Sequence, residues 1–291
     1  MSDFSTEQVP GNGRRPLDVD VFRPAEPNGV AVVLLHGGGW AGGRRAMVHG
    51  YARALSALGY VALAAEYRLL PEAPWPAQLD DVRDVVRWAK SCAQALGIDP
   101  AKIALQGFSA GAHLALLVAG TQPGSGHETA VGTDSSGSEV AAVVSFFAPA
   151  RLDANPAMLA NPPFNLLLNG GGVEAARAIS PIYFVNKAFP STFILGGMAD
   201  YMQPLASGLD LLQAFVDAEA EVEFHYFHSQ VHEFPSTPGM VNDVMAEVAF
   251  FYRRTLLDRD TLAEEAREHN PIARASSMQE FVQMMAAAQR H

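Results

Sequence analysis

The sequence predicts an α/β fold in which a mainly parallel sheet lies between two layers of helices. Three observations lead to this prediction: continuous apolar runs, helical patterns between them, and a glycine-flanked serine where one run meets a helix. Continuous runs of Val, Ile, Leu and Ala are typical of strands buried on both faces. Their alternation with helices indicates parallel strands joined by helical crossovers. The 291 residues, 49% of them apolar, suffice for one large domain or two small ones.

The apolar runs and the helical patterns alternate along most of the chain. The expected strands are Leu17–Phe22, Val30–Leu35, Val61–Ala65, Ile103–Leu105, Ala141–Phe147, Thr192–Leu195 and Val222–Phe227. The expected helices lie near 47–58, 78–96, 110–119, 204–220 and 240–257. In the second of these, Leu79, Val82 and Val86 share one face, as a helix packed on a sheet requires. The first strands are expected to form an antiparallel hairpin at the sheet edge.

Composition and charge exclude several function classes. The net charge is −11, and the 20 basic residues form no cluster of the kind that binds nucleic acid. Apolar runs are much shorter than the roughly 20 residues of a membrane span, and the polar N-terminus lacks the apolar core of a secretory signal. The single cysteine, Cys92, excludes an intrachain disulfide and fits a reducing compartment. We therefore expect a soluble, cytoplasmic protein with no nucleic-acid partner and no membrane span.

Three segments interrupt the regular pattern. Residues 121–139 are rich in Gly, Ser and Thr and are expected to form a mobile surface loop, whereas the proline-containing residues 148–190 form an insertion that can border a pocket. At the C-terminus, an apolar stripe is formed by Met278, Phe281, Val282 and Met285. A helix docked on its own domain, a homodimer contact and a flap over the site all remain open for this stripe.

The serine motif Gly107-Phe108-Ser109-Ala110-Gly111 follows the expected strand Ile103–Leu105 and opens a helix. In the pattern G-x-S-x-G, the glycines remove side chains that would collide in a sharp strand–turn–helix reversal. The serine is then held in a strained conformation above the sheet, where the N-terminus of the next helix favours negative charge. Ser109 is therefore the candidate nucleophile.

A serine hydroxyl needs a base to remove its proton and a carboxylate to orient that base. In folds with this serine turn, the acid and then the histidine follow the serine along the chain. Asp200 follows the expected strand Thr192–Leu195, and His232 follows the last expected strand. His228 is the nearest rival to His232, whereas His225 and His113 are expected to be structural.

The reaction also needs donors for a developing oxyanion. The expected strand Val30–Leu35 ends in the motif HGGGW, in which Gly37, Gly38 and Gly39 let the backbone approach a substrate oxygen closely. The N–H of Ala110 is the second expected donor. Four neighbours of the candidate residues either line a substrate pocket or pack in the core; they are Trp40, Phe108, Tyr201 and Met202.

The combination of motifs HGGGW, GFSAG, GMADYMQP and VHEF, together with the stretch Tyr67–Pro76, resembles the α/β-hydrolase superfamily. The similarity is to its hormone-sensitive-lipase-like and feruloyl-esterase-like carboxylesterases, over roughly residues 17–257. The resemblance implies an α/β-hydrolase fold with a mostly parallel sheet of about eight strands and helices on both faces. Hormone-sensitive-lipase-like members usually carry a longer N-terminal segment that helps form a cap, whereas here the HGGGW motif begins at residue 36, so we expect little or no cap domain. We expect a flexible segment at 1–16, the hydrolase domain at 17–257 and, without a match in the family, a helical extension at 258–291.

The resemblance implies hydrolysis of small to medium acyl esters through an acyl-enzyme, with no metal and no cofactor. It assigns Ser109 as nucleophile, His232 as general acid and base, and Asp200 as the orienting carboxylate. Two alternatives remain. Arylformamidase-like amide hydrolases resemble this sequence but commonly carry HGGYW, and a hydrolase-fold receptor would typically lack a member of the triad.

Overall fold

The computed structural model describes residues 3–11 and 14–288 of the chain. It divides into two compact units, Met1–Ala249 and Phe250–His291. In the first unit, the described residues form one eight-stranded sheet in the order β1-β2-β4-β3-β5-β6-β7-β8. The strands are β1 (Ser5–Val9), β2 (Leu17–Phe22), β3 (Gly29–Leu35), β4 (Val61–Ala65), β5 (Ile98–Phe108), β6 (Ala142–Phe146), β7 (Ser191–Gly197) and β8 (Val222–Phe227).

The strand pairing confirms the predicted mostly parallel sheet. β1 with β2 and β2 with β4 pair antiparallel, and all other neighbours pair parallel. The antiparallel hairpin at the edge joins β1 to β2, so the first predicted strand has a partner that precedes it. Part of the segment expected to be flexible, residues 1–16, is thus a strand of the sheet, while residues 1, 2, 12 and 13 lie outside the described residues.

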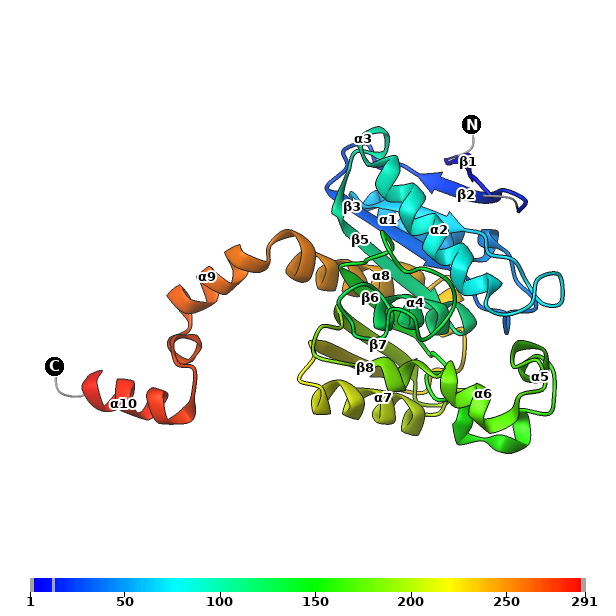
Figure 1. Ribbon diagram of the computed structural model, residues 1–291. Coiled ribbons are helices and arrows are strands. Elements are labelled where there is room, and N and C mark those ends of the chain that lie inside the picture. The colour runs from blue at the N-terminus through cyan, green and yellow to red at the C-terminus, as the bar shows by residue number, and fades with distance from the viewer. Residues whose placement is uncertain (1–2, 12–13, 289–291) are drawn as a thin grey trace. The chain divides into compact units, whose positions relative to one another are not determined.

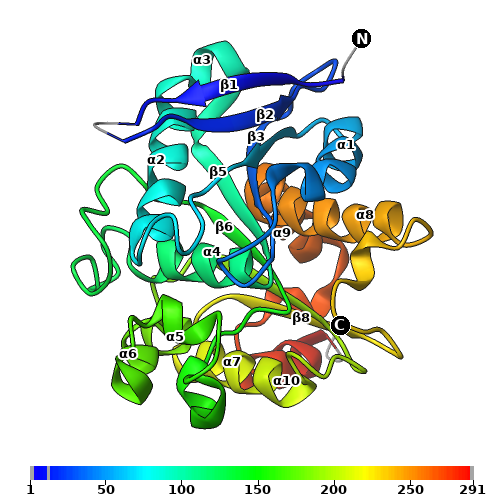
Figure 2. The same ribbon diagram turned by 90° about the vertical axis from the view of Figure 1, so that its right-hand side faces the viewer.

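The helices cover both faces of the sheet, as predicted. Figure 2 shows α1 and the start of α8 on one face and α2 and α4 on the other. The α-helices of this unit are α1 (His49–Ala57), α2 (Ala77–Ser91), α3 (Ala93–Leu96), α4 (Ala110–Gly120), α5 (Phe164–Leu167), α6 (Gly172–Ala178), α7 (Leu205–Asp217) and α8 (Val241–Tyr252), the last of which continues into the second unit. Short turns of helix lie at Arg45–Val48, Leu152–Ala154, Pro156–Met158, Pro181–Phe184 and Phe234–Ser236.

The register of the parallel strands brings the predicted motifs to one edge of the sheet. Leu35 at the end of β3 pairs with Gly107 of β5, and Phe108 of β5 pairs with Phe146 of β6. Farther along, Gly197 of β7 pairs with Phe227 of β8. The loops that follow these strands therefore emerge side by side, in the order in which the strands lie in Figure 1. Ligands of open α/β sheets bind at this carboxyl edge.

Residues 121–139 form a loop without a helix or strand, but the loop is tied to α2. The fully buried guanidinium of Arg83 donates to the carbonyl oxygens of Val131 (3.1 Å) and Thr133 (2.7 Å). Asp80 accepts hydrogen bonds from the N–H and the hydroxyl of Thr133. These contacts oppose the mobility that its Gly- and Ser-rich composition predicts.

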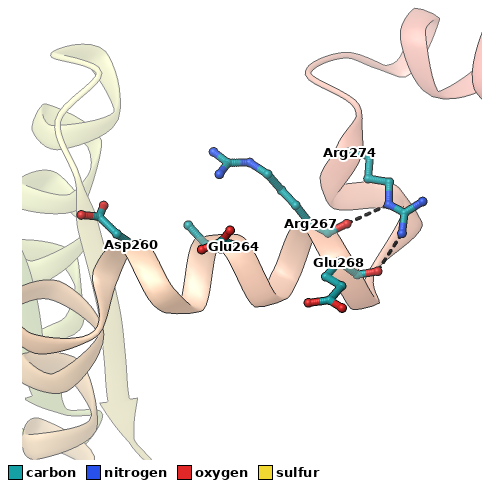
Figure 3. Close-up of a pocket in the computed structure, with 6 residues that line it drawn as sticks. Asp260, Glu264, Arg267, Glu268 and Arg274 are labelled. Carbon is teal, nitrogen blue, oxygen red and sulfur yellow. Dashed lines mark hydrogen bonds between the residues drawn. The ribbon is translucent and has the colours of Figure 1, made fainter.

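The second unit consists mainly of helices. It contains a π-helical turn at Arg253–Leu257, α9 (Arg259–His269), a short turn at Pro271–Arg274 and α10 (Met278–Ala288). Figure 3 shows Arg274 reaching back to the carbonyl oxygens of Arg267 and Glu268, both at 2.7 Å, beside a hollow lined mostly by charged side chains. Of the predicted stripe, Met278, Val282 and Met285 are exposed along α10, and Phe281 is half-buried. Of the described residues, no helix is both long and apolar enough to cross a membrane.

Candidate active site

Ser109 occupies a sharp turn between β5 and α4. Its φ of 52° and ψ of −115° are sparsely populated for a residue with a side chain. The turn is held from both sides, because the Ser109 N–H donates to the carbonyl of Phe146 (3.0 Å) and the Ser109 carbonyl accepts from the N–H of His113 (3.1 Å). The strained conformation predicted from the motif is therefore present in the structure.

The two glycines of the motif are required by close backbone approach. A β-carbon on Gly107 would lie 2.3 Å from the carbonyl oxygen of Gly111. A β-carbon on Gly111 would lie 2.3 Å from the carbonyl oxygen of Leu35, at the end of β3. The absence of side chains thus lets α4 start directly above the sheet, with the N–H of Ala110 at its free N-terminal turn.

Asp200 and His232 meet across the ends of β7 and β8. His232 Nδ1 lies 2.7 Å from Asp200 Oδ2, and the Asp200 side chain is fully buried. The other carboxylate oxygen, Oδ1, accepts the backbone N–H groups of Met202 (2.8 Å) and Gln203 (2.9 Å). Burial alone would raise the pKa of Asp200, but the hydrogen bond from His232 and the two backbone donors outweigh it and lower the pKa below 3.8. Asp200 is consequently an ionised carboxylate that is hydrogen-bonded to the imidazole of His232.

Two contacts place His232 beside the serine turn. Its ring packs on Phe147, with ring centroids 4.4 Å apart, and Phe147 directly follows the residue that accepts the Ser109 N–H. The side chain of the next residue, Glu233, comes close to both Gly37 and Ser109: a β-carbon on Gly37 would lie 2.9 Å from Glu233 Oε1 and 3.3 Å from Ser109 Cβ. The rival His228 is exposed at the end of β8, and His225 lies 2.5 Å from Glu247 through its Nδ1, so neither shares this position.

Two glycines of the HGGGW loop after β3 combine a positive φ with little space for a side chain. Gly38 has φ 118°, and a β-carbon there would lie 2.3 Å from the carbonyl oxygen of Gly42. Gly39 has φ 60°, and a β-carbon there would lie 2.9 Å from Pro163. Only glycine combines these φ values with so little space, so the backbone of the loop is free to approach a substrate oxygen.

Tyr67, the first residue of the Tyr67–Pro76 stretch, contacts the first residue of this loop, His36. Its buried hydroxyl donates to the carbonyl of His36 (2.7 Å), and its ring stacks on the His36 imidazole with centroids 4.4 Å apart. Burial lowers the pKa of His36, whose Nδ1 lies 2.7 Å from the Gly37 carbonyl. Through Tyr67, this stretch fixes the start of the glycine loop.

A family model matches the chain over residues 17–215, which is more than half of its length. The chain belongs to the BD-FAE family. The matched region includes the glycine loop, Ser109 and Asp200, and it ends before His232. Membership in the BD-FAE family agrees with the feruloyl-esterase-like resemblance of the motifs.

Curated relatives and solved structures extend this result. Esterase LipQ of Mycobacterium tuberculosis is 28% identical over 83% of this chain and 60% of its own length. Carboxylesterase NlhH of the same species is 38% identical over 37% of this chain and 35% of its own length. The Est2 esterase of Thermogutta terrifontis superposes with a TM-score of 0.71 at 22% identity, over 87% of this chain and 92% of that one, which confirms the α/β-hydrolase fold. The chain spans 60% or less of the length of these two curated relatives.

In this BD-FAE family member, two of the four expected pocket residues are core residues. Phe108 is 1% exposed and stacks on Tyr51 and Phe146, with centroids 4.4 and 4.7 Å away. Trp40 is 2% exposed, and its indole N–H donates to the buried His113 at 3.3 Å. The packing role that the sequence left open thus holds for both, and His113 is the satisfied core histidine that was predicted; burial lowers its pKa to about 4.

The other two expected pocket residues line an open cavity of about 300 Å³. Tyr201 and Met202, in the loop after β7, form one wall, and the insertion from Pro149 to Phe164 forms the opposite wall. Phe164 also contacts the Trp40 ring at a centroid distance of 5.7 Å, so the insertion touches the glycine loop. The short α5 and α6 are the only helices of the described part of residues 148–190 apart from single 3-10 turns, which agrees with little or no cap domain.

Glu233 is a residue near the site that the sequence predictions omit. A β-carbon on Gly37 would lie 2.9 Å from Glu233 Oε1 and 3.3 Å from Ser109 Cβ. The Glu233 carboxylate and the Ser109 side chain are therefore close to each other. Burial raises the pKa of Glu233 above 4.5; the charge of His232 opposes this shift and that of Asp200 adds to it. Its position directly after His232 in the sequence could have identified Glu233 as a residue near the site. Within the described ranges, no group of three or more His, Cys, Asp or Glu side chains is arranged to hold a metal ion.

Proposed function

We propose that the protein is a serine carboxylesterase that hydrolyses small to medium acyl esters through an acyl-enzyme. The observation that carries the proposal is the coexistence, at one sheet edge, of a strained Ser109 and a His232 oriented by the buried Asp200. A serine in this conformation presents its hydroxyl above the sheet, and an imidazole held by an ionised carboxylate is a suitable base.

In the proposed reaction, His232 Nε2 removes the Ser109 proton as Oγ attacks the ester carbonyl. The resulting oxyanion is stabilised by backbone N–H groups of the glycine loop, Gly37, Gly38 and Gly39, and by the N–H of Ala110. Protonated His232 then gives its proton to the leaving alcohol, which leaves Ser109 acylated. Water, deprotonated by His232, attacks the acyl-enzyme and releases the carboxylic acid.

The substrate class is supported by the surroundings of the site. The short insertion leaves an open cavity of about 300 Å³ beside the Asp200 loop, at the lower end of the sizes typical of small-molecule sites. The names of the relatives LipQ and NlhH, an esterase and a carboxylesterase, point to the same reaction.

The test is hydrolysis of p-nitrophenyl esters of increasing acyl length by the full-length protein and by Ser109→Ala. We expect measurable turnover that is highest for short and medium chains and that falls by about 10⁴-fold or more in Ser109→Ala. Ser91→Ala, an exposed serine at the end of α2, is the matched control and should keep full activity. Wild-type activity in Ser109→Ala would refute the proposal.

The same samples separate the alternatives. Faster turnover of an N-formyl aryl amide than of the matched ester would favour an amide hydrolase. Failure of both substrates, together with no labelling by a fluorophosphonate, would favour a receptor with a hydrolase fold.

A further inference from the structure

We propose that Glu233 makes the ester selectivity of this site dependent on charge, favouring esters with a cationic leaving group and disfavouring those with an anionic one. The inference rests on the proposed esterase function and adds a specificity-determining residue to it. It is carried by the position of the carboxylate, by the backbone conformation that holds it, and by the absence of a Lys or Arg partner among the described residues.

The position is defined by the backbone of the glycine loop. Glu233 Oε1 and Ser109 Cβ lie 2.9 and 3.3 Å from the same point, where a β-carbon on Gly37 would stand. The carbonyl oxygen of Phe108 lies 3.2 Å from that point. The carboxylate therefore lies close to both motifs, the one that carries the expected nucleophile and the one that carries the expected oxyanion donors.

The backbone of Glu233 is held in a conformation that favours glycine. Its φ of 62° and ψ of 16° lie in the left-handed region, which costs about 1 kcal/mol or more for a residue with a side chain. The neighbouring Phe234 and Pro235 are buried and fix the turn. A long acidic side chain in such a place is strained, which is the kind of local conflict that clusters at functional sites.

Among the residues that the structure describes, no Lys or Arg acts on this carboxylate, and the only positive charge that acts on it is that of His232. The groups that act on it electrostatically are His232 and Asp200, whereas Tyr51 of α1 experiences its charge. When His232 is protonated during catalysis, its charge offsets that of Asp200, which accepts its hydrogen bond. Because His232 is shared with Asp200, the charge of Glu233 is only partly compensated near the reacting serine.

The leaving group is the part of the substrate that experiences this charge most. In a serine hydrolase, the histidine that activates the serine later protonates the leaving oxygen. The leaving alcohol therefore lies at His232, next to Glu233 in the chain. In a partly hydrated site, one fixed charge near the leaving group changes the rate for a singly charged ester by about threefold, so the ratio of the rates for a cationic and an anionic ester changes by about tenfold.

The sharpest test uses three butyrate esters with alcohols of similar size and fixed charge. These are butyrylcholine, the neutral 3,3-dimethylbutyl butyrate and the anionic 3-sulfopropyl butyrate, with butyrate release measured by chromatography. We expect the ratio of kcat/KM for the cationic over the anionic ester to fall by about tenfold in Glu233→Gln. Glu233→Gly, which removes the charge and suits the left-handed backbone, should give the same fall. Glu26→Gln removes an equal charge from an exposed loop and should leave the ratio unchanged.

The pH dependence gives an independent readout that a purely structural role would not produce. In the wild type the ratio should rise with pH as Glu233 ionises, with a midpoint above 4.5 because burial raises its pKa. In Glu233→Gln the ratio should not change with pH. Equal ratios in the wild type and both Glu233 variants would overturn this inference while leaving the esterase function intact. No hydrolysis of any ester, p-nitrophenyl butyrate included, would instead refute the esterase function and this inference with it.

Discussion

His232 Nδ1 lies 2.7 Å from Asp200 Oδ2, and the carboxylate is fixed by two further backbone donors. This arrangement selects the tautomer that carries its proton on Nδ1 and leaves Nε2 free to accept one. This hydrogen bond links the loop after β7 to the loop after β8. The two loops are neighbours because β7 and β8 pair parallel in the sheet. The hydrogen bond is the basis of the first prediction.

Asp200→Asn should lower kcat by about 10⁴-fold with little change in KM, because an amide in this place favours the wrong tautomer of His232. The measurement is steady-state hydrolysis of p-nitrophenyl butyrate. Asp210→Asn, an exposed residue of α7, is the control and should retain wild-type kcat. An Asp200→Asn enzyme within tenfold of wild type would show that another residue orients the base.

Gly39→Ala should lower kcat by roughly 10²-fold, because its β-carbon would strike Pro163 and displace a loop of oxyanion donors. Gly29→Ala is a matched control, since Gly29 also has a positive φ, 88°, but nothing within 4 Å of the added carbon. It should lose about 1 kcal/mol of stability and keep its activity. Equal kinetic effects of the two variants would contradict a specific role of the glycine loop.

Tyr67→Phe should lower the free energy of unfolding by about 1–3 kcal/mol, because it leaves the buried carbonyl of His36 without its donor. The loop supported by this bond should also shift, with a several-fold loss of kcat. Tyr183→Phe removes a similar hydroxyl contact, 2.7 Å from Asp153, away from the loop and should not change kcat. Denaturant unfolding and steady-state kinetics on the same preparations measure both effects.

Glu233→Gln should stabilise the protein at neutral pH but not in acid. Burial raises the folded-state pKa of Glu233 above 4.5, so the folded state binds its proton more tightly than the unfolded chain does. The free energy of unfolding therefore falls as pH rises from 4.5 through the folded-state pKa of Glu233. Above that pKa the buried charge continues to destabilise the folded state. Removing the charge should raise the melting temperature at pH 7.5 by about 1–2 °C. The gain should vanish below pH 4.5; a gain that is independent of pH would point to packing rather than charge.

Much of the fold follows from apolar patterning in the sequence. The strands β2, β4 and β8 begin and end where their Val-, Ala- and Phe-rich runs do. The strand β1 was missed because Ser5–Val9 is polar and only Val9 is buried, so no apolar run marks it. The start of β5 was missed because residues 99–101 are exposed before the apolar run at Ile103 begins.

The candidate site was predictable where a motif requires a particular backbone. Gly107, Ser109 and Gly111 behave as the spacing of their motif demands, because steric contact alone dictates them. The support of the glycine loop by Pro163 and Phe164 depends on tertiary packing of an irregular insertion, which no local pattern encodes. The direction of the Glu233 side chain likewise depends on a turn that no sequence pattern predicts. The division after residue 257 and the homodimer remain predictions.

The most direct test of the central claim is peptide mapping of the full-length protein after reaction with a fluorophosphonate. We expect a single adduct on Ser109, at a rate that falls by at least about 10²-fold in His232→Ala, because the serine then lacks its base. An adduct on another residue, or an undiminished rate of labelling in His232→Ala, would show that Ser109 and His232 do not act together.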